Sequence, residues 1–80
     1  MKLELYKQET CPFCRRVLQH ISESGRNDIN YHDIITDEGA AEELTEIGGK
    51  LQVPCLLIDG EPMYESMDII EWLQAHPQEA

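Results

Sequence analysis

The chain has 80 residues and a formal charge of −10, because 16 acidic side chains outnumber 6 basic ones. This length fits one domain, residues 1–80, and 41% hydrophobic residues is a globular rather than a disordered composition. The negative charge argues against general nucleic-acid binding, since phosphates would be repelled over most of the surface. It argues equally against a polybasic membrane contact.

We expect no targeting segment and no membrane-spanning segment in this sequence. Residues 1–7 alternate charged and apolar side chains, unlike a signal peptide, and the longest apolar stretch, residues 53–58, is too short to cross a bilayer. We therefore expect a cytoplasmic protein. Thiols are mostly reduced there, so closely spaced cysteines indicate catalysis or metal binding rather than structural disulfides. Three cysteines also exclude a complete intramolecular disulfide framework.

The first part of the chain has the pattern of a strand, a helix and a second strand. Leu3 and Leu5 alternate with polar residues, which predicts a strand. Pro12 suits the first turn of the helix, and Gly25 is its predicted end. The second strand covers residues 29–34, so the βαβ unit should be right-handed with parallel strands. The apolar face of the helix consists of Cys14, Val17, Leu18 and Ile21.

The second helix is predicted from its cap and its apolar spacing. Thr36 can cap it, and residues 37–38 place acidic side chains in its first turn. The pair Gly48–Gly49 ends it. Its predicted buried face consists of Ala40, Leu44 and Ile47.

The remainder predicts a hairpin and a last helix. Residues 53–58 are continuously apolar, as in a buried strand, and Asp59–Gly60 predicts a tight turn. The antiparallel return strand contains Met63 and Tyr64. Ser66 can cap the last helix, with Pro77 just past its end. Its inner face should consist of Ile69, Ile70 and Leu73, with Trp72 packing against the sheet.

Cys11 and Cys14 are the strongest local signal. Cys11 falls at a helix N-terminus, where unpaired N–H groups and the helix dipole stabilise an anion. The thiolate is the nucleophile, and this setting typically lowers a cysteine pKa to about 3.5–7.5. Cys14 lies three residues on, within reach of Cys11. Two interpretations stay open for Arg15 and Arg16: they add positive potential beside the pair, or their side chains are simply solvated.

The alternative interpretation is that the two cysteines form half of a structural zinc site. A zinc site needs further ligands at suitable spacing, and the sequence has no second CxxC. Cys55 falls in the apolar strand, where we expect a core residue. The βαβ context favours a redox motif, and no metal is expected. The histidines are scattered without visible partners and have no assigned role: His20, His32 and His76.

The sequence resembles the glutaredoxins over essentially its whole length. Three segments carry the resemblance: TCPFC at residues 10–14, Val-Pro at 53–54 and YESMDII at 64–70. It implies an α/β, thioredoxin-like fold of order β-α-β-α-β-β-α, with three helices and a four-stranded mixed sheet of strand order 2-1-3-4. The Glu65–Ser66 pair also looks like the N-terminal domain of glutathione transferases.

The implied activity is that of a thiol–disulfide oxidoreductase with Cys11 and Cys14 as the catalytic pair. The Cys11 thiolate attacks a disulfide, and either Cys14 or glutathione resolves the mixed disulfide. Glutathione is the reducing co-substrate, and no bound cofactor is needed. The expected partners are glutathione and disulfide-containing or glutathionylated proteins, and we expect a monomer.

The resemblance also implies where glutathione binds. The Val53–Pro54 bond should be cis and face the reactive thiol, which leaves the Val53 backbone to pair with the cysteinyl part of glutathione. From the residues alone, Pro54 is an ordinary proline at a strand start, and a cis bond is not favoured. Thr10 and Phe13 are further contacts, with Phe13 partly exposed.

The start of the last helix completes the expected site. An exposed helix N-terminus binds anions, so Ser66 would hold the γ-glutamyl carboxylate. Glu65 or Asp68 would meet the γ-glutamyl amino group. The alternative for Glu65 and Ser66 is a plain strand end and helix cap.

The chain departs from the family where the glycyl carboxylate is held. A glutaredoxin often has Lys three residues before the first cysteine, and this chain has Gln8 there, with Lys7 one residue earlier. The usual Thr before Val-Pro is Gln52, and the usual Arg nearby is replaced by Lys50. Lys7, Gln8 and Lys50 are therefore additional candidates; otherwise another donor reduces the protein.

Other functions stay open at this point. One is an electron donor of the same type that is reduced by thioredoxin reductase. Another is a binding module that holds an iron–sulfur cluster between two chains with glutathione as ligand; Pro12 weighs against it, since cluster-binding relatives tend to have Gly or Ser there. A purely structural domain leaves the dithiol unexplained.

Overall fold

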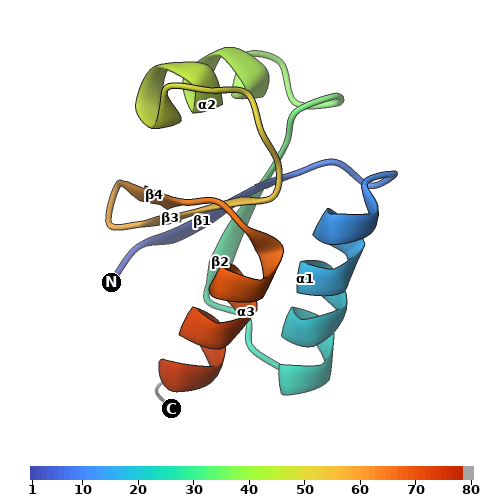
Figure 1. Cartoon of the computed structure of the whole chain (residues 1–80), viewed down its shortest axis with the longest axis vertical. Coiled ribbons are helices and arrows are strands. Elements are labelled where there is room, and N and C mark those ends of the chain that lie inside the picture. The colour runs from blue at the N-terminus through green and yellow to red at the C-terminus, as the bar shows by residue number, and fades with distance from the viewer. Residues whose placement is uncertain (79–80) are drawn as a thin grey trace.

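The structure, a computed structural model, describes residues 1–78. Seven elements follow one another in the predicted order β-α-β-α-β-β-α (Figure 1). Their bounds are β1 Leu3–Lys7, α1 Pro12–Ser24, β2 Ile29–Asp33, α2 Ala40–Gly48, β3 Cys55–Ile58, β4 Glu61–Met63 and α3 Ser66–Ala75. Within residues 1–78, no helix has the length and hydrophobicity needed to span a bilayer.

The four strands form one mixed sheet in the order β2-β1-β3-β4, which confirms the expected topology. Strands β1 and β2 are parallel, whereas β3 is antiparallel to both β1 and β4. The hairpin turn is confirmed as well, because Asp59 and Gly60 both have left-handed φ angles, 50° and 88°. That conformation matches the right-handed twist of the two strands it joins.

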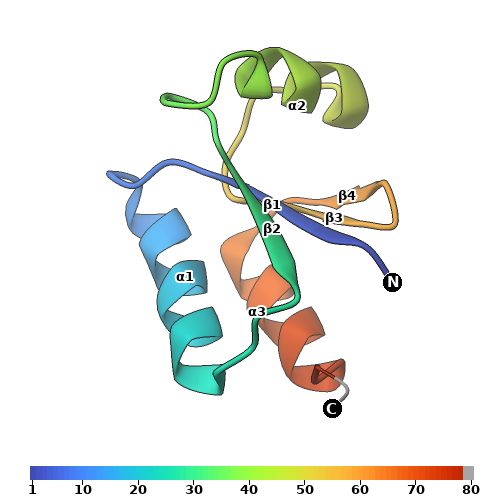
Figure 2. The ribbon, with the colours of Figure 1, turned by 180° about the vertical axis from the view of Figure 1, so that it is seen from behind.

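The helices cover both faces of the sheet. Helices α1 and α3 lie side by side on one face, and α2 covers the other (Figures 1 and 2). Side chains alternate along a strand, so Leu5 and Tyr6 enter different cores. Between the sheet and α1/α3 lie Leu3, Leu5, Val17, Ile21, Ile29, Leu56, Ile69 and Leu73. Between the sheet and α2 lie Tyr6, Ala40, Leu44, Cys55 and Leu57.

The predicted start of the second helix is wrong. Helix α2 begins at Ala40 after Gly39, whose φ of 83° is left-handed, and Thr36 is not its cap. The Asp33 carboxylate accepts the N–H groups of Ile35 and Thr36, and the Asp37 carboxylate accepts the N–H of Asp33. These side-chain bonds hold residues 33–37 as a separate turn, as Asp commonly does.

The buried face of α2 is shorter than predicted. Ala40 and Leu44 are buried, but Ile47 is 45% exposed, so its predicted burial is wrong. Tyr64 packs against this core instead, and its hydroxyl lies over Gly48. The ring of Tyr64 thus occupies the space beside the last turn of the helix.

The last helix also begins differently. Glu65 is the N-cap of α3, with φ 31° and ψ 112°, and Ser66 is the first helical residue, so the predicted Ser66 cap is wrong. Strand β4 ends at Met63, and Tyr64 lies outside it. Ile69 and Leu73 are buried as predicted, while Ile70 and Trp72 are partly buried against the same core.

Candidate active site

Cys11 is the N-cap of α1, with an extended backbone (φ −80°, ψ 121°), and Pro12 opens the helix as predicted. Its N–H donates to the Gln8 carbonyl at 3.1 Å, and its own carbonyl accepts the N–H of Arg15 at 3.0 Å. The helix ends at Gly25 in the left-handed conformation, also as predicted. The sequence therefore presents Cys11, partly exposed, directly at the helix N-terminus.

The Cys11 thiol is surrounded by hydrogen-bond donors. Burial raises its pKa, but the N–H and thiol of Cys14 and the N–H of Phe13 donate to the Cys11 sulfur and outweigh that effect. The pKa of Cys11 therefore lies below its ordinary value. Because the thiolate is the reactive form, Cys11 has the properties of a nucleophile.

Cys14 has the opposite properties. It is fully buried, and burial raises the pKa of its thiol well above the ordinary value. The N–H of Gln8 and the charge of Lys7 act in the other direction, whereas neighbouring Cys11 raises the pKa further. All three cysteines are free thiols. The pair is thus unequal: the partly exposed thiol has the lowered pKa, and the buried thiol behind it has the raised pKa.

The Val53–Pro54 peptide bond is cis, as the family resemblance implied. The Cys11 thiol faces it, with Sγ 4.0 Å from the Val53 carbonyl oxygen. Among residues 1–78, the N–H and C=O of Val53 make no hydrogen bond to another backbone group. Backbone groups without a backbone partner can pair with the backbone of a peptide ligand.

A groove of about 360 Å³ runs beside this bond. Five of the expected site residues line it, from three distant parts of the chain: Phe13, Val53, Pro54, Glu65 and Ser66. Phe13 is 56% exposed, which confirms its predicted partial exposure. The groove therefore joins the start of α1, the cis peptide bond and the start of α3.

Glu65 adopts a backbone conformation that is unusual for its residue type. Its φ of 31° is positive although it is not glycine. Such conformations cost of order 1–3 kcal/mol and cluster at functional sites, where the surrounding structure maintains them. Ser66, which follows, is buried and starts a ten-residue helix with Asp68 in its first turn. The unpaired N–H groups of that turn thus meet the groove.

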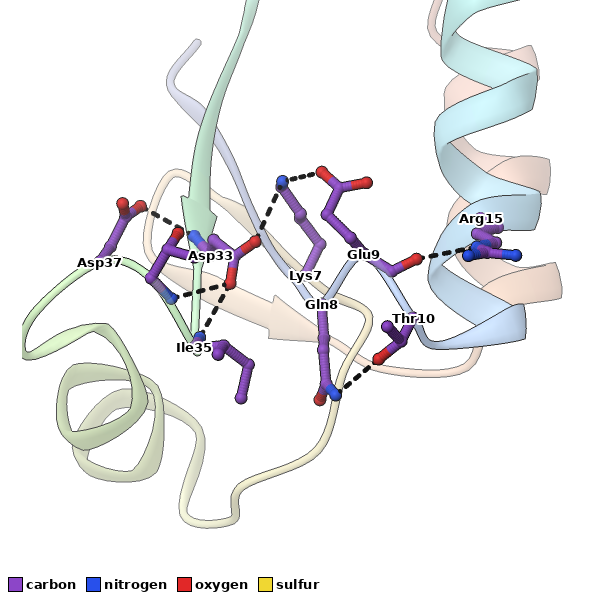
Figure 3. Close-up of polar contacts among 9 residues, drawn as sticks. Lys7, Gln8, Glu9, Thr10, Arg15, Asp33, Ile35 and Asp37 are labelled. Atoms are coloured by element: carbon purple, nitrogen blue, oxygen red, sulfur yellow. Dashed lines mark hydrogen bonds and ion pairs between the residues drawn. The ribbon is translucent and has the colours of Figure 1, made fainter.

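Several expected site residues lie outside this groove. Thr10 accepts a hydrogen bond from the Gln8 amide at 2.9 Å, and Asp68 is exposed on α3. Lys50 lies over the ring of Tyr64, with Nζ 4.4 Å from the ring centroid. Lys7 is paired with Glu9 and Asp33 (Figure 3). Their contacts with glutathione stay predictions.

Three groove residues were not predicted as ligand contacts: Arg16, Gln52 and Met67. Arg16 lies three residues after Phe13 on the exposed side of α1, a spacing that places two side chains on one helix face. From that spacing, Arg16 could have been predicted to lie beside Phe13. Its guanidinium lies 3.9 Å from the sulfur of Met67. Gln52 and Met67 are chain neighbours of predicted residues.

Cys55 and two of the histidines contact other side chains of the protein. Cys55 is fully buried, which confirms it as a core residue. The expectation that the histidines lack partners is wrong for two of them. His32 lies 3.1 Å from the Glu4 carboxylate and stacks on Tyr6, and His76 stacks on Trp72. In the described part of the chain, no three His, Cys, Asp or Glu side chains gather into a metal-binding group.

Known proteins are similar to this chain in sequence and in structure. The family described as "Glutathione S-transferase, N-terminal domain" matches residues 5–80. Glutaredoxin 3 of Escherichia coli K12 is 33% identical over 61 residues, which cover 74% of this chain and 70% of that protein.

Solved structures give the same picture. The thioredoxin-like protein BC3987 superposes with a TM-score of 0.76 at 28% identity, covering 92% of this chain and 97% of that one. Glutathione transferase Omega 3C from Trametes versicolor superposes at 0.77 with 26% identity, covering 94% of this chain but 33% of the transferase. The thioredoxin-like fold is thereby confirmed.

Proposed function

Because the chain belongs to the glutaredoxin family, and to the wider family of glutathione S-transferase N-terminal domains, we propose that it is a glutathione-dependent thiol–disulfide oxidoreductase. The unequal thiol pair carries this proposal. Cys11 is accessible and its pKa is lowered, whereas Cys14 is buried and its pKa is raised. A nucleophile backed by a protonated resolving thiol suits disulfide exchange.

The first route removes glutathione from a mixed disulfide. The Cys11 thiolate attacks the glutathione sulfur, the Cys11–glutathione bond forms, and the other thiolate leaves and takes up a proton. The thiolate of a second glutathione then attacks the glutathione sulfur of this intermediate. Oxidised glutathione leaves, and Cys11 is again a thiolate. One free glutathione is therefore consumed for each mixed disulfide reduced, and its sulfur leaves joined to the glutathione that the mixed disulfide carried.

The second route reduces a protein disulfide with both cysteines. The Cys11 thiolate attacks one sulfur of the disulfide and forms a mixed disulfide. Cys14 loses its proton and attacks the Cys11 sulfur, which expels the second protein thiolate. The product is a Cys11–Cys14 disulfide, and two molecules of glutathione return it to the dithiol. This route needs Cys14, whereas the first does not.

The groove is the proposed glutathione site. The N–H and C=O of Val53, which make no backbone hydrogen bond within residues 1–78, would pair with the cysteinyl residue and bring its sulfur to the Cys11 Sγ. The N-terminus of α3 at Ser66 would hold the γ-glutamyl carboxylate, and Glu65 or Asp68 the amino group. Phe13 forms part of the wall.

A coupled assay tests the proposal. Reduction of a small glutathione mixed disulfide is followed with glutathione and glutathione reductase in one arm and with thioredoxin reductase in the other. We expect turnover in the first arm. Turnover in the second arm alone would contradict glutathione dependence and favour a thioredoxin-reductase-linked electron donor.

Cysteine variants test the assignment of roles. Cys11→Ser should abolish activity in every assay. Cys14→Ser should retain deglutathionylation and lose most reduction of protein disulfides. Cys55→Ala is the matched control, because Cys55 is buried in the core and has no part in either route. Activity in Cys11→Ser would refute the mechanism.

A further inference from the structure

Lys7 holds an ion-pair network beside the two thiols. It is the last residue of β1 and lies opposite Asp33, the last residue of β2. Its ammonium lies 3.4 Å from Asp33 Oδ2 and also contacts the Glu9 carboxylate (Figure 3). The side chains of Lys7 and Asp33 are only 13% and 10% exposed. Shielding from solvent makes such a pair stronger than a surface pair.

Asp33 is a fixed anchor for this network. Its Oδ1 accepts the N–H of Ile35 at 2.8 Å and of Thr36 at 3.1 Å. These two hydrogen bonds, with the charge of Lys7, hold the pKa of Asp33 below its ordinary value. Asp33 is therefore ionised at neutral pH, and Lys7 faces a permanent anion.

The other end of the network reaches the helix that carries the thiols. The Glu9 carbonyl accepts the Arg15 Nε hydrogen at 2.8 Å, while the Glu9 carboxylate holds Lys7. Arg15 directly follows Cys14 in α1. The chain of contacts from Asp33 through Lys7 and Glu9 to Arg15 thus ties the end of the sheet to the first turn of α1 (Figure 3).

The loop inside this chain of contacts touches both sulfur-bearing residues. The Gln8 carbonyl accepts the N–H of Cys11 at 3.1 Å, and the Gln8 N–H donates to the Cys14 sulfur. Lys7 precedes Gln8, and its charge lowers the pKa of Cys14 against the effect of burial. The charges that act on the pKa of Cys14 are those of Lys7 and Cys11, and the carboxylates that contact Lys7 are those of Glu9 and Asp33.

We propose that Lys7 is a positioning residue for the resolving step: it holds Gln8 against Cys14, and its ammonium stabilises the thiolate that Cys14 becomes. This role rests on the proposed dithiol chemistry. When Cys14 gives up its proton and attacks Cys11, a negative charge develops in a buried place. Lys7 is the cation that opposes this charge.

The same geometry argues against Lys7 as a glutathione ligand. Figure 3 shows the Lys7 ammonium and the Gln8 amide on opposite sides of the loop, as alternating side chains are expected to lie. Two carboxylates already surround the ammonium. Lys7 therefore acts on the thiols of the protein itself. It does not take the place of the lysine that glutaredoxins often have at the position of Gln8.

A stopped-flow reaction with 5,5′-dithiobis(2-nitrobenzoate) tests the proposal without glutathione. Attack by the Cys11 thiolate releases one thionitrobenzoate and leaves the other bound to Cys11. Attack by Cys14 then releases the second and forms the Cys11–Cys14 disulfide. The first phase reports Cys11 and the second reports the resolving step. Cys14→Ser, which releases one equivalent from this pair, identifies the second phase.

We expect Lys7→Met to slow the second phase about threefold and the first phase less. Loss of the Lys7 charge raises the pKa of Cys14, so less thiolate is present, and the higher nucleophilicity of a more basic thiolate offsets part of that loss. Lys7→Arg should restore the rate. Lys7→Gln keeps a donor for both carboxylates but loses the charge, so it should remain slow. Lys2→Met is the matched control, because Lys2 lies near the far end of β1 with its side chain 69% exposed.

The outcomes separate the possible roles. Equal slowing of both phases in Lys7→Met and Lys7→Gln would mean a purely structural role and overturn the proposal. An unchanged second phase with a raised KM for glutathione would overturn it in favour of a ligand role. If the proposed glutathione dependence itself fails, the wild-type coupled assay shows it, while both phases of the thionitrobenzoate reaction still report on Lys7.

Discussion

The replacement Gly48→Ala tests whether the packing of Tyr64 against α2 supports the wall of the groove. An added methyl group at Gly48 would lie 1.7 Å from the Tyr64 hydroxyl oxygen and 2.9 Å from the ring carbon that bears it. Neither distance is tolerable, so the whole ring has to move. Tyr64 directly precedes Glu65, the N-cap of α3 and part of the groove wall. A displaced ring therefore disturbs the site as well as the fold.

The expected loss of stability follows from the contacts of Tyr64. Its hydroxyl donates to the Lys50 carbonyl at 3.1 Å, which contributes about 1 kcal/mol. Lys50 Nζ lies 4.4 Å from the ring centroid, worth about 0.5–1 kcal/mol at an exposed site. Crowding adds about 1–3 kcal/mol, and the better helix propensity of alanine returns about 1 kcal/mol. The net destabilisation is about 1.5–4 kcal/mol.

Urea unfolding of Gly48→Ala, Tyr64→Phe and the double variant measures this coupling. Phenylalanine lacks the oxygen that the new methyl group would meet, so the double variant should lose less than the sum of the single losses. The KM for glutathione should rise in Gly48→Ala. Unchanged stability of Gly48→Ala, or strictly additive losses, would refute the placement of Tyr64 against α2.

Three further predictions concern the reactivity of Cys11, the stability of the protein at acid pH and the packing of α2 on the core. Alkylation of Cys11 by iodoacetamide should reach half its maximal rate at a lower pH than for an ordinary free cysteine. Cys14→Ala should move this midpoint upward, because the side-chain donor to the Cys11 sulfur is lost. A midpoint at or above the ordinary value, found by mass spectrometry of the alkylated peptide, would contradict the site description. The pKa of Asp33 is lower in the folded than in the unfolded protein. The Asp33 carboxylate therefore stabilises the fold fully above about pH 4, and this contribution is lost as the pH falls through the folded-state pKa. Melting curves between about pH 2 and 6 should therefore show a weaker acid dependence for Asp33→Asn. Leu44→Ala should cost about 2–5 kcal/mol, because Leu44 is fully buried, whereas Ile47→Ala should cost about 0.5 kcal/mol or less. Similar losses for the two in denaturant unfolding would mean that α2 packs through a different face.

Local chemistry alone accounts for the accuracy of the α1 prediction. Pro12 has a fixed φ and no N–H to satisfy, and Gly25 adopts the left-handed conformation with little cost. Both properties belong to the residue itself, so neighbours in space do not alter them. The Asp59–Gly60 turn was predictable for the same reason.

The other helix starts depended on more distant contacts. Thr36 has the chemistry of a cap, but Asp33 and Asp37 engage the backbone first, and α2 begins only after Gly39. Ser66 likewise has the chemistry of a cap, yet Glu65 takes that position with a positive φ, beside a tyrosine that packs on α2. Competing hydrogen bonds and packing, which no single residue encodes, set both boundaries.

The sequence by itself determined where the proposed nucleophile, Cys11, lies. A cysteine at the end of a strand, followed by proline and a helix, lies where N–H groups converge, because backbone geometry requires it. Only the tertiary structure decided what surrounds that thiol. Sheet pairing and the packing of α3 beside α1 bring Val53, Ser66 and Arg16 to one groove. The ion pair between Lys7 and Asp33 likewise exists only because β1 and β2 lie parallel, with their ends in register.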